Sequence, residues 1–211
     1  MHDVFQLIRV IGQPMMRVSL VAAVVLGLVP FGWWCFLAFT DGLGANPAQY
    51  LTLSSGEWSL VGLCLVLAAT PLQRWLGFSW PLRHRRTLGL FTFFYATLHA
   101  LAWAFWEQGL VLSAMGSDVV TRLFITVGVV AFVLMVPLAI TSTNGWLRRL
   151  GRSWKRLHLL VYPALGLSVW HFWLVRAGKN DFAEVRVYIG ITLVLVMLKW
   201  VRRTRPRQRA G

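Results

Sequence analysis

The chain has 211 residues, of which 57% are hydrophobic and only 13% are charged, and its mean hydropathy is +0.63. These values exclude an ordinary soluble globular domain and favour the lipid bilayer as its solvent. A net charge of +14 would indicate nucleic-acid binding in a soluble protein, but the basic residues are distributed here as in a membrane protein.

Six apolar stretches follow one another along the chain, each near the length of about 20 residues that crosses a bilayer as a helix. The first follows Arg9 and Arg17 as a signal peptide would, but its 23 uncharged residues exceed the usual hydrophobic region of such a peptide, so we expect an uncleaved helix. In the sixth, the side chain of Lys199 must extend to the membrane interface. Transmembrane helices are predicted at about 18–40, 55–73, 87–107, 122–143, 155–175 and 183–201.

The charges between these stretches alternate. With the N-terminus inside, 17 of the 21 basic residues fall on the cytoplasmic side, whereas six of the seven acidic residues fall outside. Both termini are then cytoplasmic, which requires an even number of spans. The predicted fold is an all-α membrane protein, a six-transmembrane-helix bundle. The four basic residues left outside are Arg122, Arg176, Lys179 and Arg186.

No second domain is expected. The longest loops, near 41–56 and 74–86, are too short to hold one, and no internal repeat is evident. Residues 1–211 are therefore predicted to form a single transmembrane domain, so any soluble catalytic machinery must belong to another polypeptide.

Three histidines lie within the predicted spans, where polar side chains are costly and indicate function. His99 is in the third helix, about 16 Å from its inner end at 1.5 Å per residue. His171 is in the fifth, about 24 Å from its inner end, so helix tilt can bring the two to one level. A haem between two helices needs this arrangement, with one imidazole on each face of the iron. His2 and His84 are expected to be solvated.

His158 lies lower in the fifth helix, about 5 Å from its inner end. Thirteen residues leave it about 140° from His171 around an ideal helix, although Pro163 lies between them and a proline can kink or locally unwind a helix. No clear histidine partner lies at that level: His84 is the only candidate, and it precedes His99 by about 15 residues, which places it outside the hydrocarbon. A second haem here would need a non-histidine or water ligand.

Other interpretations of these residues stay open. A single intramembrane histidine is often only hydrogen-bonded to a neighbouring helix. Without a Cys-x-x-Cys-His motif, any haem would be b-type. Arg85 and Arg86, with Arg83, and the basic cluster at 148–156 could neutralise haem propionates or a flavin phosphate. The alternative is that they follow the positive-inside rule and contact anionic lipid.

Four segments resemble one known family: 85–90 (RRTLGL), 96–99 (ATLH), 141–143 (TST) and, above all, 150–162 (LGRSWKRLHLLVY). They are similar to the MsrQ (YedZ) family of haem-binding membrane subunits, within the ferric-reductase-like transmembrane family. The similarity extends over nearly the whole chain, including the loop at 43–47 and the exit from the second helix at 70–72.

The resemblance implies a bacterial inner-membrane protein with b-type haem and associated FMN. It implies that electrons pass from the quinone pool or a cytosolic flavin reductase to MsrP, a periplasmic molybdopterin enzyme that reduces methionine sulfoxide in oxidised proteins. His99, His158 and His171 match the haem histidines of the family. Larger ferric reductases carry two histidines on each of two helices and a fused flavin and nicotinamide domain, and this chain has neither.

The expected role is therefore an electron-transfer subunit without a catalytic site of its own for an external substrate. Two alternatives predict different behaviour. A proton-coupled transporter, in which the histidines relay protons, would be colourless. A stand-alone metal or quinone reductase of the cytochrome b type would carry haem as well, and only its electron acceptor would distinguish it.

Overall fold

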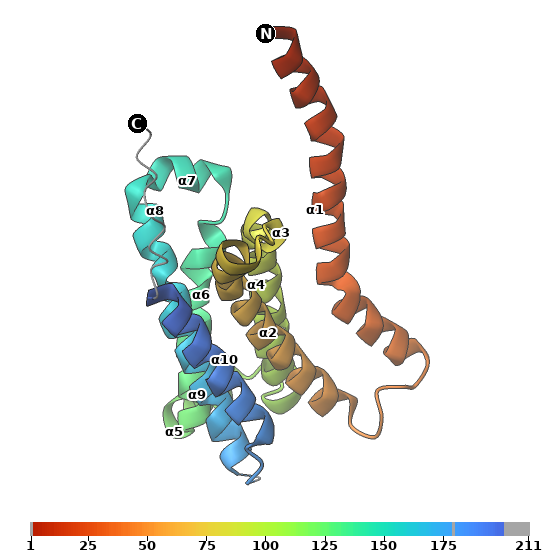
Figure 1. Ribbon diagram of the computed structural model, residues 1–211. Helices are drawn as coiled ribbons and strands as arrows, with labels where there is room; N and C mark the ends of the chain where they lie inside the picture. Colours follow the sequence, from red (N-terminus) through yellow and green to blue (C-terminus); the bar gives the residue numbers. More distant parts are fainter. Residues whose placement is uncertain (1, 179, 201–211) are drawn as a thin grey trace.

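The computed structural model describes residues 2–178 and 180–200, and the side chains of 18–178 and 180–199. All regular structure in this part of the chain is helical (Figure 1). The helices are α1 (His2–Phe39), α2 (Pro47–Leu76), α3 (Trp80–Arg83), α4 (Arg85–Ala102), α5 (Leu112–Thr121), α6 (Leu123–Ile140), α7 (Asn144–Leu150), α8 (Arg152–Leu157), α9 (Val161–Ala177) and α10 (Ala183–Trp200). The predicted basic tail from Arg202, with Val201 and Lys179, lies outside the described residues, and so do the side chains of His2, Arg9 and Arg17.

Five helical segments of the described chain are long and apolar enough to cross a membrane. They lie at Val18–Phe39, Pro47–Leu76, Arg85–Glu107, Leu123–Ile140 and Arg152–Ala177. The sixth predicted helix is present as α10, which is as long as α6 but carries Glu184, Arg186 and Lys199. Five of the six predicted spans are therefore matched by apolar helices, and the sixth is a helix of similar length that carries three charged residues near its ends.

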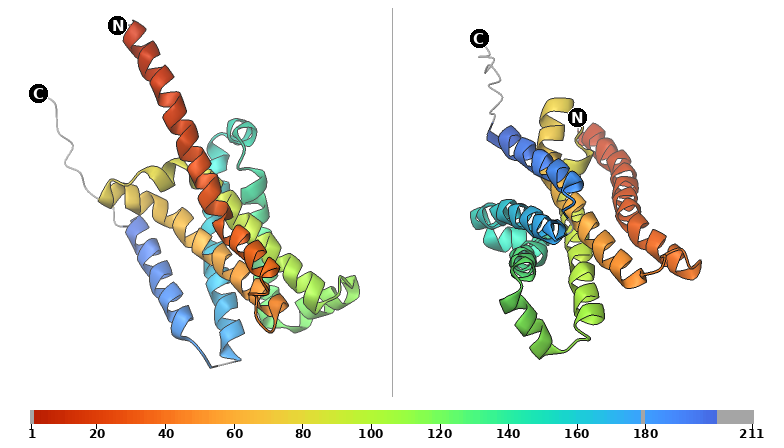
Figure 2. Two further views of the ribbon diagram at one scale, coloured as in Figure 1. Left: turned by 90° about the vertical axis from the view of Figure 1, so that its right-hand side faces the viewer. Right: turned by 90° about the horizontal axis from the view of Figure 1, so that it is seen from below.

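The long helices alternate in direction, so that α1 begins and α10 ends on the same side of the molecule (Figures 1 and 2). The main packing partners are α2 with α4 and α6 with α9, while α10 lies against α2 and α9. The N-terminal part of α1 stands away from the other helices. Its C-terminal part is held by two hydrogen bonds: the Tyr95 hydroxyl donates to the Gly27 carbonyl (2.6 Å), and Trp34 Nε1 donates to Ser54 Oγ (3.1 Å).

Helix α2 begins eight residues before its predicted start. Asn46 caps it by accepting a hydrogen bond from the Gln49 backbone N–H (3.0 Å), and Pro47 occupies the first turn, where its missing N–H costs nothing. The prediction of a loop over 41–56 was wrong for its second half, because it followed hydrophobicity and ignored this capping signal. As a result, the stretch from Thr52 to Glu57 is helical, and within it Ser55 is buried in the bundle.

Two segments depart from α-helical geometry next to the predicted site residues. Helix α4 continues as a π-helical turn, η1 (Trp103–Glu107). A 3₁₀ turn, η2 (His158–Leu160), joins α8 to α9. Because a 3₁₀ helix advances 120° per residue, this turn reduces the angle between His158 and His171 from about 140° to about 80°. The departure from α-helical geometry begins five residues before Pro163, at His158 itself, and it winds the chain more tightly instead of unwinding it.

The buried core lies where α2, α4, α6 and α9 meet. Apolar side chains fill it, among them Leu63 on α2, Met135 on α6 and Leu165 on α9, which is 1% exposed. The outward faces of the same helices remain apolar and exposed, as expected when lipid covers them. The candidate site lies beside this core, between α4 and α9.

Candidate functional site

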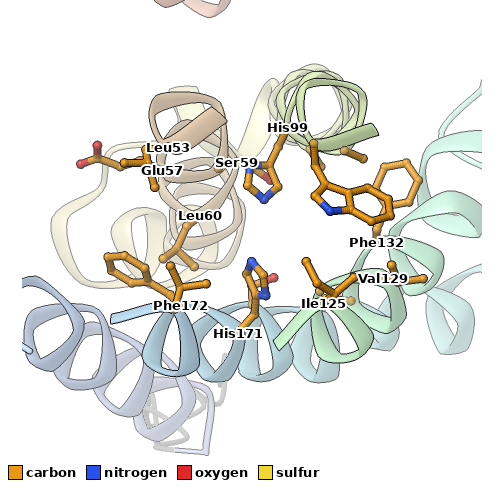
Figure 3. Close-up of a pocket in the computed structure, with 18 of the residues that line it drawn as sticks. Leu53, Glu57, Ser59, Leu60, His99, Ile125, Val129, Phe132, His171 and Phe172 are labelled. Carbon is orange, nitrogen blue, oxygen red and sulfur yellow. The ribbon is translucent and has the colours of Figure 1, made fainter. Parts of the chain in front are cut away.

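A cavity opens between α2, α4, α6, α9 and α10 (Figure 3). It contains about 1240 Å³ of space free of protein atoms, counted to its open sides. Its walls are largely apolar and include Leu53, Leu60, Ile125, Phe132 and Phe172. A deep apolar cavity with few polar groups is the usual form of a cofactor site.

His99 and His171 face one another across this cavity, one from α4 and the other from α9 (Figure 3). Their ring centroids are 6.0 Å apart, and the ring planes are inclined by 75°. The expected common level is therefore present: the structure brings together two histidines that lie 72 positions apart in the chain.

Each of these imidazoles is held by a main-chain carbonyl. His99 Nδ1 lies 2.8 Å from the Thr52 carbonyl oxygen, and His171 Nδ1 lies 2.7 Å from the Phe124 carbonyl oxygen. A carbonyl can only accept a hydrogen bond, so Nδ1 carries the proton in both rings. The lone pair of each Nε2 is then free to bind a metal, and the Nδ1–H bond makes that nitrogen a stronger ligand.

The separation of the two rings leaves room for one haem iron between them, which His99 and His171 would hold. Two metal–nitrogen bonds of about 2 Å, with the distance from each nitrogen to its ring centre added, come to about 6 Å, which matches the observed separation. Among the described residues, no group of three His, Cys, Asp or Glu side chains could hold a bare metal ion. Two facing imidazoles in an apolar cavity fit a metal that would bring its own equatorial ligands, as haem would.

His158 lines a second cavity, which lies between α2, α4, α6, α8 and α9. This cavity contains about 1120 Å³ of space free of protein atoms, counted to its open sides. Its Nδ1 lies 3.1 Å from the Trp154 carbonyl oxygen, and its ring stacks on the Trp154 indole. Its Nε2 is buried and has no hydrogen-bond partner within the described chain. Because Trp154 Nε1 in turn donates to the Thr141 carbonyl (2.8 Å), the segment at 141–143 helps to fix this histidine.

In the described part of the chain, three arginine side chains line the two cavities. Arg85 and Arg86 line the second cavity with Lys155, and Arg86 Nη1 donates to Asn144 Oδ1 (2.5 Å). Arg176 lines the first, where its guanidinium pairs with Glu184 and lies 3.5 Å from Asp181. Of the basic residues predicted to neutralise a cofactor, Arg85, Arg86 and Lys155 thus lie at the cavity of His158 and not at the facing pair, while Arg83 donates a hydrogen bond to Ser79 and does not line that cavity.

His84 is not the solvated residue that the sequence predicted. It is only 7% exposed, its Nε2 lies 2.6 Å from Ser19 Oγ on α1, and its ring packs on Trp80. The short helix α3 folds it under α1, a contact that a loop prediction for 74–86 could not anticipate. His84 does not line the second cavity and is no ligand partner for His158.

The family described as ferric reductase like transmembrane component matches residues 55–169 of this chain. The protein-methionine-sulfoxide reductase heme-binding subunit MsrQ of Ralstonia nicotianae is 50% identical over 191 residues, which cover 89% of this chain and 88% of the relative. The chain belongs to the MsrQ family. Other MsrQ proteins are similar: that of Bordetella pertussis is 48% identical over 85% of this chain and 88% of its own, and that of Herminiimonas arsenicoxydans is 44% identical over 89% and 88%.

Membership of the MsrQ family agrees with the resemblance found in the sequence, and the transmembrane family and the five apolar helices make the chain a multi-pass membrane protein. Sequence reasoning missed Thr52 and Phe124, which act through main-chain atoms that leave no trace in a side-chain pattern. It also missed Trp103, whose Nε1 is buried at the first cavity without a partner among the described residues. From its place near the outer end of the third helix, Trp103 was predicted to belong to an aromatic belt at the membrane interface, and its position four residues after His99 was the signal for a place at the cavity.

Proposed function

We propose that this chain is the haem b-bearing electron-transfer subunit of a protein-methionine-sulfoxide reductase system, with His99 and His171 as the axial ligands. The facing imidazoles, 6.0 Å apart with both Nδ1 atoms held by carbonyls, carry this proposal. The printed names of the relatives, which describe heme-binding subunits of such a reductase, support it.

When bound, haem supplies a carrier for one electron at a time. The residues of the chain do the rest. The carbonyls of Thr52 and Phe124 hold the two rings in the ligating tautomer, and the apolar walls exclude water and keep the dielectric constant low.

The proposed setting is the bacterial inner membrane, with six spans and both termini in the cytoplasm. The alternating helices and the 17 basic residues of the predicted inner side support this orientation. The facing histidines then lie in the outer half of the membrane, close to a periplasmic acceptor of the MsrP type. Donation by the quinone pool or a cytosolic flavin reductase, and the association of FMN, stay predictions from the family resemblance.

We also assign His158, Arg85 and Arg86 to cofactor binding at the second level. The unpartnered Nε2 of His158 and the basic side chains around the second cavity support a second anionic prosthetic group there. A second haem at this place would take His158 on one face of the iron and a ligand other than histidine on the opposite face.

A reduced-minus-oxidised visible spectrum of the purified protein, with haem quantified per chain, tests the proposal. The wild-type protein should be red, and His99→Ala or His171→Ala should each lose most of the haem. A colourless wild-type protein would favour the transporter, and a full spectrum in either variant would refute the ligand assignment. To distinguish a stand-alone reductase, the reduced protein is mixed with an MsrP-type enzyme or with a ferric chelate; we expect fast oxidation by the first only.

A further inference from the structure

The surroundings of the two facing histidines repeat along the chain. Each imidazole donates its Nδ1–H to a carbonyl on the first helix of its own helical hairpin. The two spacings are equal: 47 residues separate His99 from Thr52, and 47 separate His171 from Phe124. The first hairpin is formed by α2 and α4, and the second by α6 and α9. The second set of atoms therefore follows the first at a constant offset of 72 positions.

A glycine stands beside each ring at the same offset. A Cβ atom at Gly56 would lie 3.0 Å from His99 Nδ1, and one at Gly128 would lie 2.9 Å from His171 Nδ1. Each glycine comes four residues after the carbonyl that holds the ring, one helical turn further along the same helix. Among the glycines of the described chain, only these two would place a Cβ against a histidine ring.

The cavity walls continue the pattern. Residues 72 positions apart line the cavity from opposite hairpins, as the pairs Leu53 and Ile125, Leu60 and Phe132, and Ala100 and Phe172 illustrate. In Figure 3 the labelled members of α2 and α6 lie on opposite sides of the two imidazoles. Few of the paired residues are identical, so the repeat is one of position and not of sequence.

We infer that the site is a two-fold structural repeat in which Gly56 and Gly128 are the positioning residues of His99 and His171. Each glycine leaves the space that lets an imidazole lie against the facing helix and donate Nδ1–H to the carbonyl one turn earlier. This inference rests on the proposed function for its readout, since it concerns how the two rings are presented to haem iron.

The size of the clash predicts the effect of removing a glycine. Non-bonded heavy atoms approach favourably to about 3.5 Å, so an alanine Cβ at 2.9–3.0 Å must displace the ring by about half an ångström. The displacement lengthens or breaks the Nδ1–H bond and makes the imidazole a weaker electron donor. Ferric iron is then less stabilised, and we expect the midpoint potential to become more positive.

The test compares Gly56→Ala and Gly128→Ala with Gly166→Ala, a matched control on α9 whose added Cβ would meet nothing within 4 Å. We expect each of the first two variants to retain less than half of the wild-type haem, with altered low-spin absorption and electron-paramagnetic-resonance spectra and a more positive midpoint potential. The control should match the wild type in all three measurements.

The possible failures are distinguishable. If the wild-type protein binds no haem, the proposed function fails. If the wild type binds haem and His99→Ala loses it, but both glycine variants keep the wild-type spectrum and potential, only the positioning role fails. If both glycine variants fail to accumulate in the membrane while Gly166→Ala accumulates, the glycines are needed for helix packing itself and the positioning role is likewise overturned.

Discussion

The indole of Trp154 lies nearly parallel to the imidazole of His158, with ring centroids 3.7 Å apart and planes inclined by 25°. The same indole donates a hydrogen bond to the Thr141 carbonyl (2.8 Å) at the end of α6. Trp154 therefore ties the 3₁₀ turn that carries His158 to a neighbouring helix, and it controls the orientation of the third histidine from one helical turn away.

Replacing Trp154 separates these two contacts. Trp154→Phe retains an aromatic ring against His158 but loses the hydrogen bond, which should lower the free energy of unfolding by about 0.5–1.5 kcal/mol. Trp154→Ala loses both contacts and should also alter any spectral component that depends on His158. Thermal unfolding and visible spectra of the two variants test this; equal spectra for Trp154→Ala and wild type would show that the stack does not orient the ring.

The buried, unpartnered Nε2 of His158 predicts partial loss of bound cofactor in His158→Ala. The facing pair is left intact, so most of the haem should remain and only a second spectral component should disappear. His84→Ala is the control and should keep the wild-type spectrum, because His84 forms a hydrogen bond with Ser19 and lines neither cavity. Unchanged haem content and potentials in His158→Ala would remove this residue from the site.

Arg176 places a positive charge at the first cavity, paired with Glu184 and near Asp181. Arg176→Gln should shift the midpoint potential to more negative values, because a nearby cation favours the reduced cofactor and its loss leaves two carboxylates uncompensated. A redox titration monitors the shift. The matched control is Arg122→Gln, since Arg122 pairs with Asp118 (3.1 Å) away from the cavity; identical potentials in all three proteins would contradict the prediction.

The Tyr95 hydroxyl bond to Gly27 anchors α1 to α4, and Tyr95 is only 3% exposed. Tyr95→Phe should lower the free energy of unfolding by about 1 kcal/mol, near the upper part of the range for hydrogen bonds between membrane helices. Haem content should not change, because Tyr95 lines neither cavity. Detergent-induced unfolding of Tyr95→Phe, beside the exposed control Tyr50→Phe, measures the difference; equal stability of the two would rule out an anchoring role.

Much of this site could be predicted from the sequence because its main determinant is a one-dimensional distance. Counting 1.5 Å per residue along two apolar helices places His99 and His171 within reach of one level, and the structure brings their rings together. Hydrophobicity also located the apolar helices. It failed at α2, where Asn46 and Pro47 start the helix within polar sequence, and at His84, whose burial depends on the tertiary contact with α1.

The internal repeat could not be found in the sequence for a different reason. Its determinants are two carbonyl oxygens, which every residue type provides, and two glycines, which are only distinctive once their neighbours are known. Thr52 and Phe124 share no side-chain chemistry, yet they serve matching histidines. The angle of about 140° between His158 and His171, by contrast, could be calculated from the sequence. The 3₁₀ turn at His158–Leu160, which makes this angle smaller, could not be predicted from it.

Because main-chain oxygens hold both rings, we expect substitutions at positions 52 and 124 that preserve the helix to leave the geometry of the two imidazoles unchanged. A saturation library at either position should tolerate most substitutions, so the two atoms that set the tautomer of the ligands would escape a genetic search for essential residues. The vulnerable positions lie one helical turn onward, where any side chain larger than hydrogen enters the space of an imidazole.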